Sequence, residues 1–291
     1  MNQTGTGATG CVPSQESLCL FDGRFEVQAE YRDYGGNAGT GKAVLLTPDT
    51  GYFWFFNSTN VEAVAKMVSF CGSGTNNVGF YAGGLTDVEV KLKVKDTLNG
   101  TYREYTNPLG RPFDLVRDGP FACAAQVAGE MIPAPTPGRG GAPPVSGTPA
   151  ATASWKIVRE GPVPTGKAEP ASPALASCVD DDTTVCLYGG RFKVKASYKD
   201  YSGASGVGHA VKLTPDTGYF WFFSSSNVEA IAKIVNFCGS ATNNYGIYAG
   251  GMTDLEVHLY VTDTEKGTYR EYVNPLGKGF SLLSDGPFQC P

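Results

Sequence analysis

Histidine is scarce in this chain, and long apolar runs and concentrated basic charge are lacking. The two histidines, His209 and His258, lie in the C-terminal half, and Lys42 and Lys91 stand at the corresponding places of the N-terminal half. A histidine-based triad or metal site common to both halves is therefore excluded. No apolar run approaches the roughly 20 residues of a membrane-spanning helix, so we expect no membrane span. The net charge of −5 shows no basic face, which makes nucleic acid a poor partner.

Motifs for metals and nucleotides are lacking too. The chain has no C-x-x-C, no cysteine and histidine cluster, no glycine-rich loop between a strand and a helix, and no D-x-D-x-D-G loop. Asp180-Asp181-Asp182 would be the place for calcium, yet the N-terminal half has Pro13-Ser14-Gln15 there. Acidic residues common to both halves fall mostly in turns or beside Lys and Arg, which favours structural roles over paired-carboxylate catalysis. We therefore expect no enzyme, no catalytic residue, no metal site and no cofactor.

What the chain does have is eight cysteines, four in each half. An even number of regularly spaced cysteines is typical of secreted β domains, where they form disulfide bridges, and is rare in cytosolic proteins. Four cysteines allow three connectivities. We favour a local bridge from Cys11 to Cys19 and a long bridge from Cys71 to Cys123, with the same pattern for Cys178, Cys186, Cys238 and Cys290. The polar start, MNQTGTGATG, has neither a charged n-region nor an apolar h-region. We expect a secreted or cell-surface protein in its mature form, without its signal peptide.

The chain contains an internal repeat. Residues 11–123 align without a gap onto residues 178–290, with 73 identities in 113 positions. We call these segments repeat 1 and repeat 2, and expect each to be one domain after an N-terminal tail at 1–10. Residues 124–177 hold ten prolines and much Ala, Gly and Ser, which is typical of an extended linker.

One short stretch of the linker differs in composition. In residues 154–159, Trp155 and Ile157 alternate with Lys156 and Val158. Two interpretations stay open. The stretch is either an apolar spot in a disordered linker, or a short strand that is donated to the sheet edge of its own chain or of a neighbour.

Within a repeat, alternation with a period of two predicts β-strands. It is clearest in 24–31 and 88–95, and further strands are expected at 42–46, 52–56, 78–83 and 101–106, separated by turn sequences. The segment Asn60 to Phe70 fits a helix or a strand, and we favour a strand. This pattern predicts an all-β protein with two tandem antiparallel β-sandwich domains of immunoglobulin-like type.

These residues resemble an uncharacterised β-domain family of predicted secreted bacterial proteins. The resemblance covers both repeats but not the linker, and it implies a secreted β module without a known activity. In repeat 1 it is carried by Cys11 with Cys19-Leu20, Gly23-Arg24-Phe25, Asp49 to Phe56, Asn60-Val61-Glu62 with Lys66, Leu85 to Thr97, and Tyr105 to Pro108.

The remaining candidate site is a run of five aromatic residues that occurs twice. It comprises Tyr52, Phe53, Trp54, Phe55 and Phe56, and again Tyr219, Phe220, Trp221, Phe222 and Phe223. On a strand, three of the five side chains point one way and two the other. Only one of these faces is needed for the core of a sandwich. The other is covered by a loop, the linker or a neighbouring chain, or it binds a sugar or a peptide.

We therefore expect a non-catalytic module that binds an extracellular protein or polysaccharide, or assembles with copies of itself. The alternative is a disulfide-stabilised, two-headed protease inhibitor that presents a loop such as 47–51 or 107–110. A third possibility is an accessory module for calcium or carbohydrate.

Overall fold

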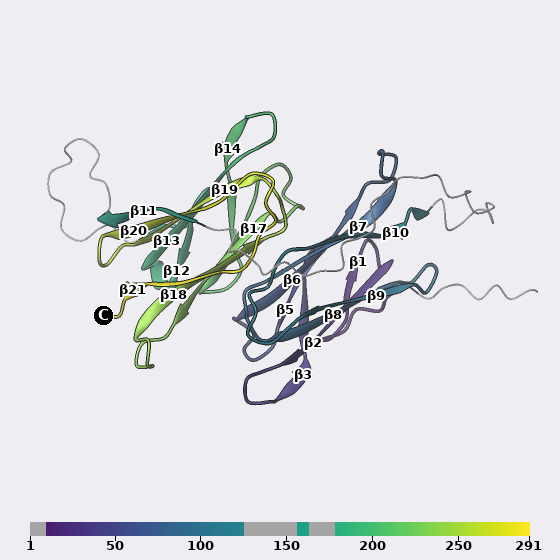
Figure 1. Cartoon of the computed structure of the whole chain (residues 1–291), viewed down its shortest axis with the longest axis horizontal. Coiled ribbons are helices and arrows are strands. Elements are labelled where there is room, and N and C mark those ends of the chain that lie inside the picture. Colours follow the sequence, from purple (N-terminus) through teal and green to yellow (C-terminus); the bar gives the residue numbers. More distant parts are fainter. Residues whose placement is uncertain (1–9, 125–155, 163–177) are drawn as a thin grey trace, which may run out of the picture.

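The structure, a computed structural model, describes residues 10–124, 156–162 and 178–291, and its regular secondary structure is almost wholly antiparallel strand (Figure 1). The all-β class is confirmed. Repeat 1 contains β1 (Leu18–Leu20), β2 (Phe25–Arg32), β3 (Ala38–Thr40), β4 (Lys42–Thr47), β5 (Thr50–Trp54), β6 (Val61–Ser69), β7 (Asn77–Gly84), β8 (Glu89–Asp96), β9 (Tyr102–Asn107) and β10 (Val116–Ala122). The described ranges contain no helix with the length and apolar character that a membrane crossing requires.

The C-terminal part repeats this series and adds one strand before it. The added strand is β11 (Lys156–Pro162). Repeat 2 contains β12 (Val185–Leu187), the 3-10 turn η1 (Tyr188–Gly190), β13 (Phe192–Lys199), β14 (Ser205–Val207), β15 (His209–Lys212), β16 (Thr217–Trp221), β17 (Ala230–Asn236), β18 (Asn244–Gly251), β19 (Glu256–Asp263), β20 (Thr268–Asn274) and β21 (Leu283–Gln289).

Each repeat folds into two sheets. In repeat 1, sheet A has the order β1-β2-β8-β9 with β3 beside β2, and sheet B has the order β10-β7-β6-β5-β4. In repeat 2, sheet C has the order β11-β20-β19-β13-β12 with β14 beside β13, and sheet D has the order β15-β16-β17-β18-β21. Sheets A and C are equivalent, as are B and D, except that β11 extends sheet C.

The two sheets of a repeat enclose its core. Along β2, the apolar side chains of Phe25, Val27 and Ala29 are fully buried, and the polar residues between them are only half-buried. They meet Phe53 of β5 and Phe80 of β7 from the opposite sheet in one apolar cluster. Repeat 2 has the same cluster at equivalent positions. The antiparallel β-sandwich that the alternation predicts is therefore present.

The likeness to an immunoglobulin domain holds at the level of two packed antiparallel sheets. In a constant-type immunoglobulin domain, no more than two consecutive strands stay in one sheet. Here β4, β5, β6 and β7 follow one another through sheet B as a meander.

The segment from Asn60 to Phe70 is a strand, β6, as we favoured. Its pattern was ambiguous because the strand is buried on both faces, from Val61 to Met67. Ala63, Ala65 and Met67 belong to the core of repeat 1, and the face between them is covered by repeat 2. A strand that is covered on both sides loses the alternation of apolar and polar residues.

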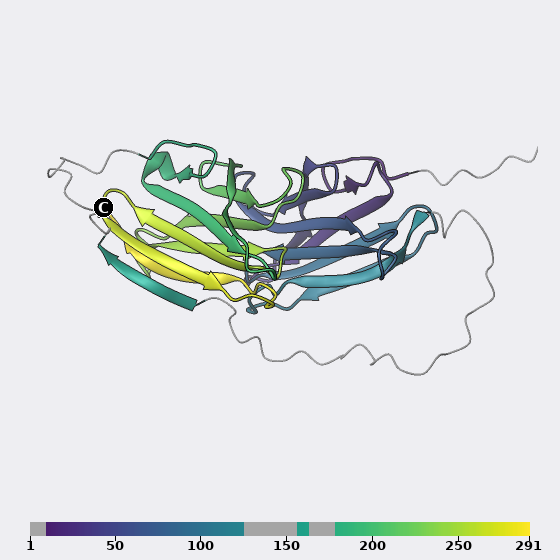
Figure 2. The ribbon, with the colours of Figure 1, turned by 90° about the horizontal axis from the view of Figure 1, so that it is seen from above.

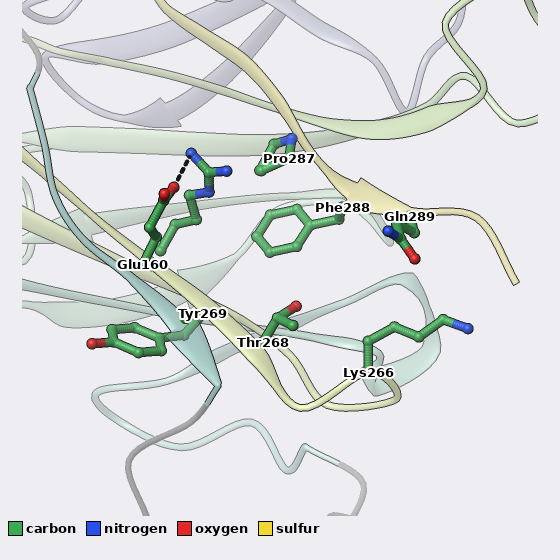
Figure 3. A pocket seen from close by; sticks show the side chains of 9 residues that line it. Glu160, Lys266, Thr268, Tyr269, Pro287, Phe288 and Gln289 are labelled. Carbon is green, nitrogen blue, oxygen red and sulfur yellow. Dashed lines mark ion pairs between the residues drawn. The ribbon is translucent and has the colours of Figure 1, made fainter.

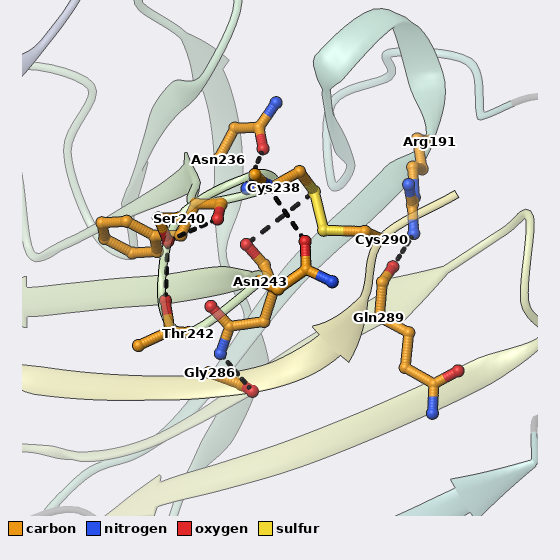
Figure 4. Close-up of a disulfide and its surroundings, with 12 residues drawn as sticks. Arg191, Asn236, Cys238, Ser240, Thr242, Asn243, Gly286, Gln289 and Cys290 are labelled. Atoms are coloured by element: carbon orange, nitrogen blue, oxygen red, sulfur yellow. Dashed lines mark hydrogen bonds between the residues drawn. A yellow bond between two sulfur atoms is a disulfide. The ribbon is translucent and has the colours of Figure 1, made fainter.

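The disulfide pattern is confirmed. Cys11 pairs with Cys19 and Cys71 with Cys123. In repeat 2 the same pairs are Cys178 with Cys186 and Cys238 with Cys290. Close to the last bridge, the guanidinium of Arg191 donates a hydrogen bond of 2.6 Å to the carbonyl of Gln289 (Figure 4). Every bridge closes within one repeat.

Candidate functional site

The first candidate site is the contact between the two repeats. Sheets B and D bring their outer faces together in an apolar cluster to which both repeats contribute. Figures 1 and 2 show the two sandwiches side by side, with β5 and β6 of one lobe near β17 of the other. The buried members are Tyr52, Val61, Val64 and Leu85 from repeat 1, and Tyr219, Val228, Ile231, Met252 and Leu282 from repeat 2.

The two sheets come close to one another at glycines of β7 and β18. A Cβ atom on Gly83 of β7 would lie 3.4 Å from the carbonyl oxygen of Gly251, and one on Gly250 would lie 3.4 Å from that of Gly84. Gly83 and Gly84 correspond to Gly250 and Gly251, so the contact from β7 to β18 repeats the contact from β18 to β7. This reciprocity is the mark of a two-fold contact, in which the same surface is used on each side.

The aromatic run divides between two buried surfaces. Phe53 and Phe55 point into the core of repeat 1, whereas Tyr52 lies in the contact with repeat 2 and Trp54 packs against it. The residues Phe220, Phe222, Tyr219 and Trp221 have the corresponding places in repeat 2. The face that needed a cover is thus covered by the other repeat, so the run does not form a continuous surface for a ligand.

Phe56 and Phe223 alone in the two runs are solvent-exposed, at 51% and 57%. Phe56 packs edge-on against Tyr31, and Phe223 packs in the same way against Tyr198. Tyr31 also lines a shallow pocket of about 490 Å³ beside β3. These two small aromatic sites, with the half-buried Trp54 and Trp221, are the accessible part of the predicted binding face.

Charged side chains are buried in the contact between the repeats. The Lys66 ammonium of β6 crosses to repeat 2, where it donates hydrogen bonds to Asn227 Oδ1 at 2.5 Å and to the Val228 carbonyl at 3.0 Å. The Lys233 ammonium of β17 crosses the other way, to Asn60 Oδ1 at 2.6 Å and the Val61 carbonyl at 2.9 Å. Each lysine is only 2% exposed.

Each of these lysines, its asparagine partner and one nearby carboxyl group form a set. Glu62 is 3% exposed, accepts a hydrogen bond from Asn60 Nδ2, and lies 3.9 Å from Lys233 Nζ. Glu229 is 4% exposed and accepts the equivalent hydrogen bond from Asn227 Nδ2. Each set therefore joins an asparagine and a glutamate of one repeat to a lysine of the other.

Burial shifts the protonation of these groups toward their neutral forms. Loss of solvation raises the pKa of Glu62 and of Glu229, and the opposing lysine charge offsets this only in part. It lowers the pKa of Lys66 and of Lys233, against the attraction of Glu229 and Glu62 respectively. A proton shared within each set is thus held less firmly by the lysine and more firmly by the carboxyl than in water.

These buried sets were missed by sequence reasoning. Glu62 and Lys66 fit either a surface helical pair or one face of a strand, and neither interpretation buries them. The available signal was that Asn60, Glu62 and Lys66 recur in repeat 2, as Asn227, Glu229 and Lys233, and that the residues between them are apolar in both repeats.

The second candidate site is a sheet edge. The described part of the predicted donor stretch is β11, which pairs antiparallel with β20 of its own chain. Its charged residues pair across the strands: Arg159 lies 3.5 Å from Glu271, and Glu160 lies 2.8 Å from Arg270 (Figure 3). Ile157 stands opposite Tyr272 in the register, and Trp155 lies outside the described residues.

Beside this pairing, a shallow pocket of about 500 Å³ lies between β11, β20 and β21. Glu160, Tyr269, Phe288 and Lys266 are among its lining residues (Figure 3). It has a mixed polar and apolar lining and no arrangement of groups that indicates a reaction.

The equivalent edge of repeat 1 has no partner strand in the part of the chain that the structure describes. β9 is the last strand of sheet A, and no other described segment pairs with its outer side. It has the same sequence as β20 from Thr101 to Tyr105, corresponding to 268–272. Arg103 and Glu104 are exposed there, whereas Glu271 of β20 is 6% exposed. An unpaired edge strand is a template for another strand.

The other candidates have structural partners. Asp180 accepts a hydrogen bond from the Cys186 amide, Asp181 from Thr183, and Asp182 pairs with His209. Across the described part of the chain, no three His, Cys, Asp or Glu side chains come together as a metal site would require. The inhibitor loop 47–51 is not free, because Thr47 donates a hydrogen bond to the Ser226 carbonyl of repeat 2 and Thr50 is buried.

No family model, curated protein or solved structure matches this chain. The resemblance to an uncharacterised secreted β-domain family therefore stays a prediction. The case for a function depends on the geometry of the two sites.

Proposed function

We propose that this protein is an extracellular, non-catalytic binding module that takes up an extended protein segment as an added strand on β9. The observation that carries the proposal is the difference between two equivalent edges. The β20 edge is paired with β11, and the β9 edge is unpaired among the described residues. In strand addition, main-chain hydrogen bonds supply affinity, and side chains select the partner.

The side chains of β9 indicate what it would accept. β11 presents Arg159 and Glu160 to Glu271 and Arg270. β9 carries the same two charges in the same order, as Arg103 and Glu104. The segment with the matching pattern is 156–162, so the proposed occupant is this segment of a second copy, released from the β20 edge of that copy. The protein would then assemble head to tail.

The cysteine pairing supports an extracellular setting. All eight cysteines are within bridges, and such bridges persist in oxidising compartments. Non-catalytic action is supported by the two candidate sites, since the charges of the first are enclosed between the repeats and the second is a plain sheet edge.

A synthetic peptide with the sequence of residues 156–162 tests the proposal directly. Titrated into the whole protein, it should bind, and a peptide with N-methylated backbone amides should not, because it lacks the donors of the ladder. Reversal of the charges on β9 (Arg103→Glu with Glu104→Arg) should weaken binding by a few fold, in line with about 0.2–1 kcal/mol per exposed ion pair.

The same reversal on β20 (Arg270→Glu with Glu271→Arg) is the matched control, and it should leave the added peptide's affinity unchanged. Binding that is insensitive to β9 would contradict the proposed site. Light scattering then addresses the second copy. If the protein is a monomer at high concentration, both with and without residues 154–159, self-assembly is excluded. The partner would then be a segment of a different protein.

A further inference from the structure

The buried sets between the repeats are not used by strand addition on β9. In each, an amine donates a hydrogen bond to a carboxamide, and the carboxamide donates one to a carboxyl group, all enclosed away from water. We propose that Lys233 and Asn60, and likewise Lys66 and Asn227, form isopeptide bonds spontaneously, so that two covalent links join repeat 1 to repeat 2.

The geometry places the reacting atoms together. Lys233 Nζ lies 2.6 Å from Asn60 Oδ1, and Lys66 Nζ lies 2.5 Å from Asn227 Oδ1. The amide carbon that each amine would attack is bonded to that oxygen. A rigid scaffold that holds an amine and an amide at contact distance makes their reaction intramolecular. This accounts for a large part of the rate increase over the same reaction between free molecules.

The carboxyl group is in position to move the proton. Glu62 accepts a hydrogen bond from Asn60 Nδ2, the nitrogen that must leave, and is 3.9 Å from Lys233 Nζ, which must lose a proton. Glu229 accepts the equivalent hydrogen bond from Asn227 Nδ2. A carboxyl group between a nucleophile and a leaving group is the usual arrangement for general acid–base assistance.

Burial provides the required protonation states. A lysine attacks only as the neutral amine, and burial lowers the pKa of Lys66 and Lys233. Burial also raises the pKa of Glu62 and Glu229, so each can hold the proton that the lysine gives up. The ring centroid of Tyr81 lies 5.8 Å from Lys66 Nζ, and that of Tyr248 lies 5.7 Å from Lys233 Nζ. Both rings help to exclude water.

The reaction balances without a further reagent. After Lys233 passes a proton to Glu62, the Nζ lone pair forms a bond to Cγ of Asn60, and the carbonyl electrons move onto Oδ1. Glu62 gives this proton to Nδ2 and, as a carboxylate again, takes up the second proton from Nζ. The carbonyl re-forms, the Cγ–Nδ2 bond breaks, and ammonia departs. An amine and a carboxamide have become a secondary amide plus ammonia, with no oxidation or reduction.

The intact mass of the full chain decides the question. With its disulfides reduced and alkylated, the denatured protein should be lighter than its sequence by one ammonia, about 17 Da, for each bond formed. Trypsin should then fail to cut after Lys66 and Lys233, and should release two linked peptide pairs. The sequence mass together with normal cleavage after both lysines would overturn the proposal and leave ordinary buried ion pairs.

A cut in the linker gives an independent readout. All four disulfides close within a repeat. A protease site inserted between residues 139 and 140 therefore allows the halves to separate under reducing, denaturing conditions, unless another covalent bond joins them. A single band at the size of the whole chain is expected. Two bands at half its size would contradict the links.

The two sites serve as controls for each other. Glu62→Gln keeps the shape and removes the proton carrier, so it should halve the mass loss and leave only the link between Lys66 and Asn227. Lys233→Arg keeps the positive charge and removes the nucleophile, with the same expected result. Equal mass loss in these variants and in the unchanged protein would show that the losses arise elsewhere.

Discussion

β9 and β20 share the stretch Thr-Tyr-Arg-Glu-Tyr, yet they differ in exposure. Tyr272 of β20 is fully buried, whereas its equivalent Tyr105 of β9 is only half-buried. Both tyrosine hydroxyls donate a hydrogen bond of 2.9 Å to an aspartate, Asp285 and Asp118 respectively. Among the described segments, β11 lies beside β20 and none lies at the outer edge of β9, which accounts for the difference. The environment of a strand depends on its neighbour as much as on its own residues.

Sheets B and D, which pack against each other, share most of their contacts across the two repeats. Lys66 and Lys233 make the same contacts in opposite directions, and Tyr52 and Tyr219 are equally buried at 7%. The repeats differ in two ways: among the described residues sheet C has one more strand than sheet A, and Arg117 pairs with Asp254 at 2.6 Å, whereas repeat 2 has Ser284 in place of Arg117.

The largest expected effect tests whether the two cores are equivalent. Phe53→Ala and Phe220→Ala each remove a fully buried ring, and each should lower the free energy of unfolding by about 3–5 kcal/mol. The matched control is Phe56→Ala, whose ring is half exposed, with an expected loss of less than about 0.5 kcal/mol. Denaturant titration measures all three. A clear difference between the losses in free energy of unfolding caused by Phe53→Ala and by Phe220→Ala would show that the two cores are not equivalent.

A smaller effect concerns the charges in the contact between the repeats. Burial raises the pKa of Glu62 above its ordinary value of 4.5, while Lys233 and Asp87 act on it in opposite directions. The folded protein thus binds this proton more tightly than the unfolded chain, so stability falls as pH rises from about 4.5 through the raised pKa. Each unit of pKa shift corresponds to about 1.4 kcal/mol.

Glu62→Gln removes this titration, and the free energy of unfolding of the variant should fall less steeply over that range. Denaturant titrations at a series of pH values give the slope. Glu229→Gln should behave in the same way, and the double variant should show the flattest profile. Identical slopes for the variants and the unchanged protein would show that these carboxyl groups are not perturbed.

The smallest effect concerns the edges themselves. Amide hydrogens at the outer side of β20 should exchange more slowly than those of β9, by about five-fold for each hydrogen bond worth about 1 kcal/mol. Deletion of residues 156–162 should bring the exchange rates of the two strands together. Native-state hydrogen exchange measures this, with β13 as an internal reference. Different rates that persist after the deletion would mean that β11 is not the cause.

Local patterns were sufficient for much of the fold. The alternation in 24–31 and 88–95 predicted β2 and β8, and the favoured cysteine pairing, one of three that the sequence allows in each repeat, is the observed one. β1, β3 and β10 were missed, since two are only three residues long and β10 is irregular, with a register shift between Asp118 and Phe121. Short or bulged strands carry little alternation.

The candidate sites were harder to predict, because their partners are far apart in sequence. Alternation correctly separated Tyr52 and Trp54 from Phe53 and Phe55, but it gave no sign that the cover is the other repeat. Lys66 and Asn227 are 161 positions apart. No local rule identifies such a partner, although the recurrence of the same three residues in both repeats marked the place.

The reciprocal contact between sheets B and D has an evolutionary consequence. Because each repeat offers the same surface to the other, a chain with a single repeat could have used that surface to form a homodimer. Gene duplication would then have fused a pair that already existed, and the linker would have turned an association dependent on concentration into one that is always intramolecular.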